Sequence, residues 1–252
     1  MKVGDRVRTE IALPGIPAST RGIVTEVGRL FVVVAFEDGR HGYYARRQLT
    51  AVYSLPGGNE SPTNELVLLG IAGTRVPRGS HLCLLPSSGT AALNITARYA
   101  AAGMNGRECT LCVVPDKWRT RFLHCLSLLR TDMDAAIHSE GLKIVSSSDF
   151  YLTPAKFAAH DQLERTATSI SRTAKENPGG LRIFGCVGQT HTADGWWEYE
   201  ERITPILKAF GATALCVYDH DGLPPGLEQK TTLLHTHVLR DGQLTVGGSR
   251  IF

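Results

Sequence analysis

The segment that most constrains the fold runs from residue 81 to residue 116, where the sequence predicts a strand, a turn and a helix in succession. Residues 82–85 are an apolar Leu-Cys-Leu-Leu run typical of a buried strand. Residues 86–90 form a Pro-Ser-Ser-Gly-Thr turn, and residues 91–102 predict a helix that ends at Gly103. Another buried strand is predicted at residues 109–114. This order indicates an α/β domain.

The turn has the position of a phosphate-binding loop without its composition. The motif GxxxxGKS/T places a lysine against the phosphates and a hydroxyl on Mg²⁺. Here the turn has no lysine, and the nearest basic residue of the turn and helix is Arg98. The sequence therefore argues against nucleotide hydrolysis. An anion can still bind at the helix N-terminus, which gives as candidate ligand-binding residues Ser87, Ser88, Gly89 and Thr90.

Strands and helices continue to alternate after this segment. Helices are predicted at residues 118–129, 154–176 and 196–210, and strands at residues 142–145, 181–187 and 213–218. The alternation favours an α/β fold, with a parallel or mixed sheet covered by helices on both faces. Ligands of such sheets collect beyond the carboxyl ends of the strands. We therefore expect a site at the loops 87–90, 188–197 and 218–221.

The N-terminal residues have the pattern of a small all-β domain. Short alternating runs at residues 3–8, 22–27, 30–36 and 41–44 predict strands. They resemble SH3-like barrels, and we expect such a β-barrel over residues 1–54, followed by a linker at residues 55–65. Such barrels present an aromatic and basic face to a partner, which here would be Tyr43, Tyr44, Arg46 and Arg47. In the alternative interpretation, one tyrosine packs inward and the arginines are only solvated.

Composition favours a cytoplasmic protein with two globular parts. The 252 residues are 42% hydrophobic and 20% charged, and no apolar run approaches the roughly 18–20 residues of a membrane span. The N-terminus lacks a signal-peptide pattern. The first 54 residues carry eight basic and five acidic side chains, and the remainder carries 19 of each. This excess of +3 is too small to predict nucleic-acid binding, although the barrel is where nucleic acid would bind.

Two groups of residues raise the question of a metal site. Cys109 and Cys112 are three apart in a predicted strand, so their side chains point to opposite faces, and we expect reduced, buried cysteines. His235 and His237 fall on one face of a strand, and with Asp219, His220 and Asp221 they offer metal ligands if the two loops meet. Capping by Asp219 and an edge-strand role for the histidines are favoured instead. We predict no metal, and a cofactor cannot be named.

The segment that follows residue 194 offers apolar walls for a ligand pocket. Trp196 and Trp197 open a helix after Asp194, a candidate N-cap. One tryptophan is expected to pack on the sheet and the other to border a pocket. Glu198 and Glu201 predict a solvated helix face. Ser87 and Ser88 lack the GxSxG elbow of a nucleophile, so the sequence does not predict an enzyme and offers no catalytic residue.

Several short motifs in order resemble the MEDS domains, sensory domains named from methanogen and methylotroph proteins. They are residues 81–85, residues 149–152 with Phe157, the pair Tyr199-Glu200, residues 214–219, and Leu-His-Thr-His at residues 234–237, where Val238 replaces the usual proline. The resemblance covers residues 66–252. It implies a RecA-like fold without the Walker lysine and a role as a ligand or signal sensor. The implied ligand-binding residues are His81, Tyr151, Tyr199, Glu200, Tyr218, Asp219 and His237, and Trp196 and Trp197 join them as candidate pocket walls.

Three classes of function follow. The first is a non-catalytic sensor or regulatory protein whose degenerate RecA-like domain binds a small ligand or a protein partner. The second is a nucleotide-binding protein without hydrolysis, with phosphates at residues 87–90. The third is an enzyme built on the histidines and aspartates near the C-terminus, for which no spacing in the sequence enforces a catalytic geometry.

Overall fold

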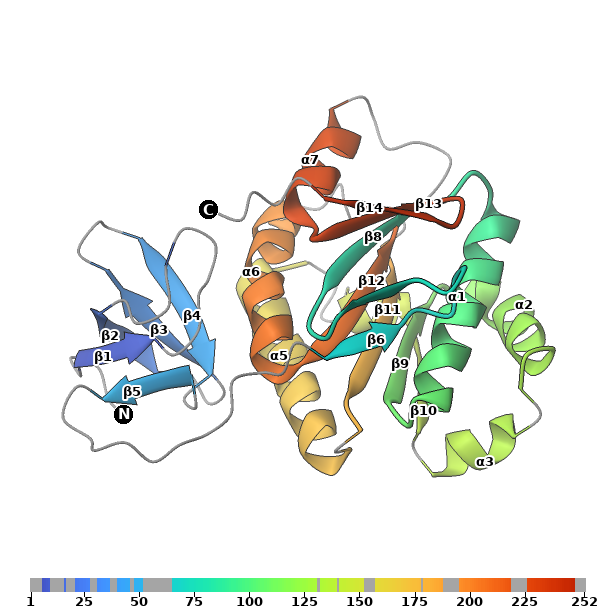
Figure 1. Cartoon of the computed structure of the whole chain (residues 1–252), viewed down its shortest axis with the longest axis horizontal. Helices are drawn as coiled ribbons and strands as arrows, with labels where there is room; N and C mark the ends of the chain where they lie inside the picture. Colours follow the sequence, from blue (N-terminus) through green and yellow to red (C-terminus); the bar gives the residue numbers. More distant parts are fainter. Residues whose placement is uncertain are drawn as a thin grey trace.

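The computed structural model describes residues 6–9, 16, 21–27, 31–36, 40–45, 48–51, 65–130, 132–139, 141–151, 157–177, 179–187, 195–218 and 226–247. These residues form a five-stranded antiparallel sheet near the N-terminus and a larger α/β part (Figure 1). The larger part is built on a seven-stranded sheet and also carries a two-stranded hairpin of β6 (Leu66–Leu68) and β7 (Arg75–Pro77).

The seven-stranded sheet confirms the predicted mainly parallel α/β architecture. Its strand order is β10-β9-β11-β12-β8-β13-β14, and only the β13–β14 pair is antiparallel within it. The strands are β8 (His81–Leu85), β9 (Cys109–Val114), β10 (Leu142–Ser146), β11 (Leu181–Cys186), β12 (Ala212–Val217), β13 (His237–Arg240) and β14 (Gln243–Val246).

Helices cover both faces of this sheet (Figure 1). On one side lie α1 (Gly89–Asn105) and α2 (Asp116–Ser127), and on the other lie α5 (Ala159–Glu176) and α6 (Trp196–Phe210). Alternate strand residues enter the two cores: Leu82 and Leu84 pack with α1 and α2, whereas Cys83 packs with α5 and α6. Shorter helices are α3 (Met133–His138), α4 (Ser147–Tyr151) and α7 (Leu227–Leu234).

The structure corrects the predicted end of α1 at Gly103. The helix begins at Gly89, because the Ser88 hydroxyl accepts a hydrogen bond from the Ala91 N–H, and it runs on to Asn105. Gly103 lies inside it, where a Cβ atom would come within 2.7 Å of the Arg182 side chain. The glycine therefore permits close packing and does not end the helix. The sequence also missed α3, α4, α7 and the β13–β14 hairpin.

The N-terminal sheet has the order β4-β3-β2-β1-β5, all antiparallel. Its strands are β1 (Arg6–Thr9), β2 (Arg21–Val27), β3 (Phe31–Ala35), β4 (His41–Ala45) and β5 (Leu49–Ala51). The sheet has its own apolar core, which includes Val32, Val34 and Tyr44. Tyr44 is fully buried there, which contradicts its predicted place on a partner-binding face and agrees with the alternative in which one tyrosine packs inward. Arg46 and Arg47 lie outside the described residues.

Strand β4 of the N-terminal sheet packs against α6 (Figure 1). Val33 and Tyr43, which are paired across β3 and β4, contact the core beneath α6 and not the core of their own sheet. The guanidinium carbon of Arg202 lies 4.5 Å from the centre of the Tyr43 ring. Helix α6 is thus placed between the N-terminal sheet on one side and the seven-stranded sheet on the other.

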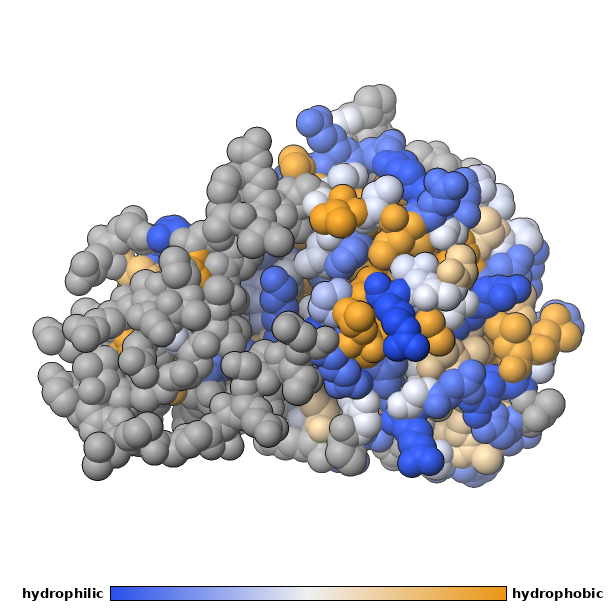
Figure 2. Space-filling model, in the orientation of Figure 1, coloured by the Kyte–Doolittle hydropathy of each residue, from blue (hydrophilic) through white to orange (hydrophobic). Residues whose placement is uncertain are grey.

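The described surface mixes hydrophilic and hydrophobic side chains. On the face of Figure 2, orange patches are small and are separated by blue residues. The large apolar side chains that are exposed include Leu66, Leu68, Leu128 and Leu129. Within the described helices, no segment combines the length and the apolar character that a membrane crossing requires.

Candidate functional site

Four side chains that can bind a metal or a polar ligand meet beneath α6. They are His81, Glu200, Cys216 and His235, and one ligand atom from each lies within 4.8 Å of the others. His81, Glu200 and His235 have 0% exposure, and Cys216 is the member of this group that is partly exposed. We refer to these four residues as the polar cluster. Burying such polar groups in a core costs free energy unless each has a hydrogen-bond or ion-pair partner.

Four separate elements place the polar cluster. His81 opens β8, Glu200 lies in the second turn of α6, Cys216 lies in β12, and His235 is the residue that follows α7. The backbone of His81 is fixed by Thr236: the His81 N–H donates to Thr236 Oγ1 over 3.0 Å, and the Thr236 N–H donates to the His81 carbonyl over 2.7 Å. These bonds join the start of β8 to the segment that leads into β13.

Both histidines point Nε2 into the polar cluster and use Nδ1 for a hydrogen bond outside it. His81 Nδ1 lies 2.8 Å from Thr204 Oγ1, and His235 Nδ1 lies 2.7 Å from the Thr231 carbonyl oxygen. A carbonyl only accepts, so His235 Nδ1 carries a proton. The Nε2 atoms face inward: His81 Nε2 is 3.3 Å from Cys216 Sγ and 3.5 Å from Glu200 Oε2, and His235 Nε2 is 3.1 Å from the same oxygen.

The electrostatics of the cluster follow from its burial. Burial, with His235 as a further cause, holds the pKa of His81 well below its usual value. Burial raises the pKa of the Cys216 thiol well above its usual value, and the nearby Glu200 carboxylate raises it further. A neutral His81 and a protonated thiol therefore lie beside Glu200, and the Cys216 thiol donates to Glu200 Oε1 over 3.8 Å.

An aromatic layer lies beside the polar cluster. Trp196 is fully buried and contacts the rings of Tyr151, Phe157 and Tyr199 at centroid distances of 5.3–5.5 Å. Trp197 is half-buried, and the Lys230 ammonium of α7 lies 4.9 Å from its ring. These positions fit the expectation that one tryptophan packs on the sheet.

Burial raises the pKa of Tyr151, Tyr199 and Tyr218, so these phenols stay protonated. Tyr218 is itself fully buried, with its ring centroid 5.9 Å from that of His235. The predicted aromatic site residues are therefore mainly core residues that lie next to the cluster.

The turn at residues 87–90 lies apart from the polar cluster, at the carboxyl end of β8. Ser88 caps α1, whereas the Ser87 N–H donates to Asp241 Oδ1 over 3.1 Å. Asp241 belongs to the β13–β14 turn, and its carboxylate occupies the hydrogen bond of the Ser87 N–H. Gly89 and Thr90 begin α1, and Thr90 is exposed.

The sequence placed His237 among the ligand-binding residues, whereas His235 was considered only as a metal ligand and set aside for an edge-strand role. His237 begins β13, is half-buried, and bonds through Nδ1 to Thr236 Oγ1 over 2.9 Å, whereas His235 lies in the polar cluster. Cys216 was missed. Residues 188–194 and 219–225, with Asp194, Asp219, His220 and Asp221, lie outside the described residues.

The cysteines behave as the strand pattern predicted. All six are free thiols, and four are buried. Cys109 packs in the core under α5 and α6, whereas Cys112 packs in the core under α1 and α2, which confirms that they point to opposite faces of the sheet.

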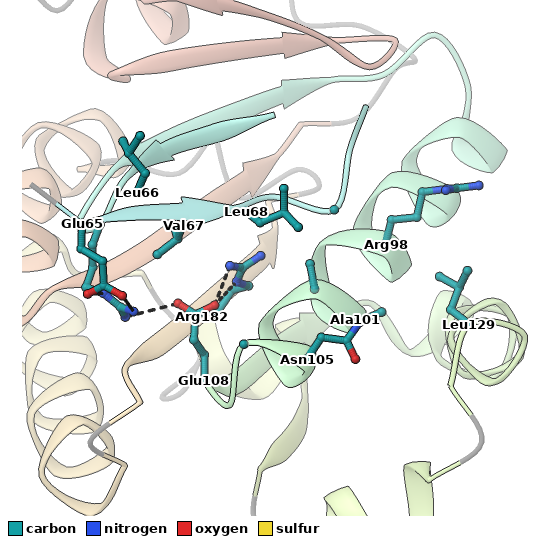
Figure 3. A pocket seen from close by; sticks show the side chains of 14 residues that line it. Glu65, Leu66, Val67, Leu68, Arg98, Ala101, Asn105, Glu108, Leu129 and Arg182 are labelled. Atoms are coloured by element: carbon teal, nitrogen blue, oxygen red, sulfur yellow. Dashed lines mark hydrogen bonds and ion pairs between the residues drawn. The ribbon is translucent and has the colours of Figure 1, made fainter. Parts of the chain in front are cut away.

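A surface hollow of about 460 Å³ lies between β6 and α1 (Figure 3). Four of its charged groups pair with one another: the Arg78 guanidinium contacts Glu65 at 2.8 Å and Glu108 at 3.3 Å, and Arg182 Nε donates to Glu108 Oε2 over 2.7 Å. None of the predicted site residues lines it. Glu65, the last residue of the predicted linker, is held here by Arg78.

The fold and the site define an α/β domain with a polar cluster in its interior. The family can then be read from the sequence: the model of MEDS, the methanogen/methylotroph DcmR sensory domain, matches residues 80–237, which is 158 of the 252 residues. The chain belongs to this family of sensory domains. The match begins one residue before His81 and ends two residues after His235, so it contains the whole polar cluster. The chain matches no curated protein.

Proposed function

We propose that this protein is a non-catalytic regulatory sensor that binds a small ligand in its MEDS domain and passes the bound state to its N-terminal sheet through α6. The sheet is proposed to be an SH3-like barrel and the MEDS domain a RecA-like domain without hydrolysis. The five antiparallel strands and the mainly parallel sheet with its β8–turn–α1 segment support these assignments. The protein would pass its signal to a partner, since a sensor needs an output.

The observation that carries the proposal is the position of α6. Glu200 projects from this helix into the polar cluster, whereas Arg202 stacks on Tyr43 of β4. Residues two apart in a helix point to nearly opposite sides, since each residue turns the helix by about 100°. A shift of Glu200 that follows ligand binding would therefore move a residue that contacts the N-terminal sheet.

The buried state of the cluster supports binding over turnover. His81, Glu200 and His235 have no exposed surface, and an acid–base catalyst must reach its substrate. The nucleotide alternative has less support, because Ser87 already donates to the Asp241 carboxylate and the turn has no lysine. A carboxylate at that point repels phosphate.

Tryptophan fluorescence tests the proposal, because two of the three tryptophans lie at the start of α6. We would titrate the full chain with dichloromethane, methanol, methylamine and MgATP, and repeat each titration on Trp118→Phe, which removes the signal from α2. The proposal expects a saturable change with a small C1 compound that Trp118→Phe retains and Trp197→Phe loses. A response to MgATP alone would favour the nucleotide alternative, and silence with all four compounds would contradict small-ligand sensing.

A further inference from the structure

We propose that His81, Glu200, Cys216 and His235 bind one divalent transition metal ion of the zinc class. The ligand set is two imidazoles, one thiolate and one carboxylate, and each of these groups is a common zinc ligand. The inference does not depend on which small compound the domain senses, because a metal can bind here whether it is the signal, part of the ligand site or a structural ion.

The distances within the polar cluster fit tetrahedral coordination. Zinc lies about 2.0–2.2 Å from nitrogen and oxygen ligands and about 2.3 Å from sulfur. Tetrahedral angles then place two N or O ligands roughly 3.4 Å apart, and a nitrogen and a sulfur roughly 3.6 Å apart. The structure has 3.1 and 3.5 Å from the two Nε2 atoms to Glu200 Oε2, and 3.3 Å from His81 Nε2 to Cys216 Sγ. The remaining pairs of ligand atoms lie within 4.8 Å of each other, so a bound ion would draw them slightly closer.

The outer hydrogen bonds orient both imidazoles as metal ligands. A metal-binding histidine commonly donates its second ring N–H to a carbonyl, a carboxylate or another acceptor, which fixes the ring and its tautomer. His235 Nδ1 makes this bond to the Thr231 carbonyl, and His81 Nδ1 has Thr204 Oγ1 at the same kind of distance. Each ring thus has its Nε2 aimed at the centre of the polar cluster.

The charge and lone pairs that face one another in the polar cluster favour a bound cation. When His235 is neutral, its Nε2 lone pair faces the Glu200 carboxylate oxygen at 3.1 Å, so a proton or a metal ion must lie between the two atoms. A metal ion would satisfy both histidines, the carboxylate and the thiolate together. Metal binding drives off the thiol proton of Cys216.

Cobalt(II) provides a direct test, because it replaces zinc in tetrahedral sites and its spectrum reports the ligands. We would strip the full chain with a chelator, titrate it with Co²⁺, and then displace the Co²⁺ with Zn²⁺. The wild type is expected to bind one equivalent, with intense visible bands of tetrahedral cobalt and a near-ultraviolet sulfur-to-cobalt charge-transfer band. Cys216→Ser should lose the charge-transfer band, and His235→Ala should lower the affinity at least 100-fold.

Two further variants separate the site from its surroundings. His237→Ala, two residues from His235, should bind cobalt as the wild type does. Thr204→Val removes only the outer partner of His81 and is expected to weaken binding about 10–100-fold. If a variant does not fold, the wild-type spectrum still decides the matter. A wild-type chain that stays folded and takes up no cobalt, or a charge-transfer band that persists in Cys216→Ser, would overturn the proposal.

Discussion

Two buried glutamates on opposite sides of the same sheet have very different partners. Glu108 accepts from the guanidinium of Arg182 over 2.7 Å and also contacts Arg78, whereas the closest basic groups to Glu200 within the described residues are the imidazoles of His81 and His235. Guanidinium groups are always charged, but imidazoles are charged only conditionally. Glu108 is thus neutralised by the fold itself, whereas Glu200 requires a proton or a metal ion.

The surroundings of the two carboxylates extend the comparison. Arg182 also donates to the Tyr99 carbonyl over 3.2 Å and lies over the Tyr99 ring, so its charge is fully partnered beside α1. Around Glu200, the pKa of His81 is lowered and that of Cys216 is raised, both mainly by burial. The first arrangement is neutralised by permanent charges, whereas the second is the one that we propose to change when a metal ion binds.

The largest effect on stability is expected at the buried pair of Arg182 and Glu108. Replacing Arg182 by Met leaves a buried Glu108 with one arginine fewer, and we expect a loss of about 3–5 kcal/mol in the free energy of unfolding. Urea denaturation should give the same loss with Zn²⁺ and with a chelator. The control is Arg202→Met, which removes a guanidinium at a less buried position. A loss that appears only with Zn²⁺ would show that the two sides of the sheet are not separate.

The matched variants Glu108→Gln and Glu200→Gln test the difference directly. Glu108→Gln should destabilise the chain with or without metal, because both arginines lose their counter-charge. Glu200→Gln should change the metal-free stability little and remove most of the stabilisation by metal. For the wild type, that stabilisation is about 2.7 kcal/mol at 100 times the dissociation constant. If Zn²⁺ stabilised the two variants equally in urea denaturation, the claim that the metal depends on Glu200 and not on Glu108 would be contradicted.

A smaller effect is expected where α6 meets the N-terminal sheet. A double-mutant cycle with Tyr43→Leu and Arg202→Met should give a coupling energy of about 0.5–1 kcal/mol from the cation–π contact. Arg202 also pairs with Glu198 at 2.6 Å, so Glu198→Gln is the control that removes the ion pair and keeps the ring contact. We expect the coupling measured by thermal unfolding to change when Zn²⁺ is added. A coupling energy of zero would contradict the proposal that α6 connects the polar cluster to the N-terminal sheet.

Sequence patterns predicted most of the strands and helices, but they did not predict which side chains come into contact. The apolar runs of β8, β9, β11 and β12 and the periodicity of α6 were sufficient for the α/β architecture. The β13–β14 hairpin was missed, although its Asp241-Gly242 turn, with positive φ at both residues, is a strong hairpin signal.

The polar cluster could be predicted only in part. His81 and Glu200 were chosen because they match family motifs, not because any spacing joins them. Cys216 was missed, since it looks like an ordinary strand residue. His235 was considered as a metal ligand and set aside in favour of an edge-strand role. Four side chains from four distant elements have no sequence signature, and only the packing of α6 on the sheet brings them together.

Metal content tests the central claim most directly. We would purify the full chain without a chelator, reconstitute it with Zn²⁺, remove free ions and measure zinc per chain by elemental analysis, beside Glu200→Gln and Glu108→Gln. The account predicts roughly one zinc per wild-type chain and per Glu108→Gln chain, as one tetrahedral site requires, and little zinc in Glu200→Gln. A folded wild-type chain without zinc, or equal zinc in all three proteins, would contradict it.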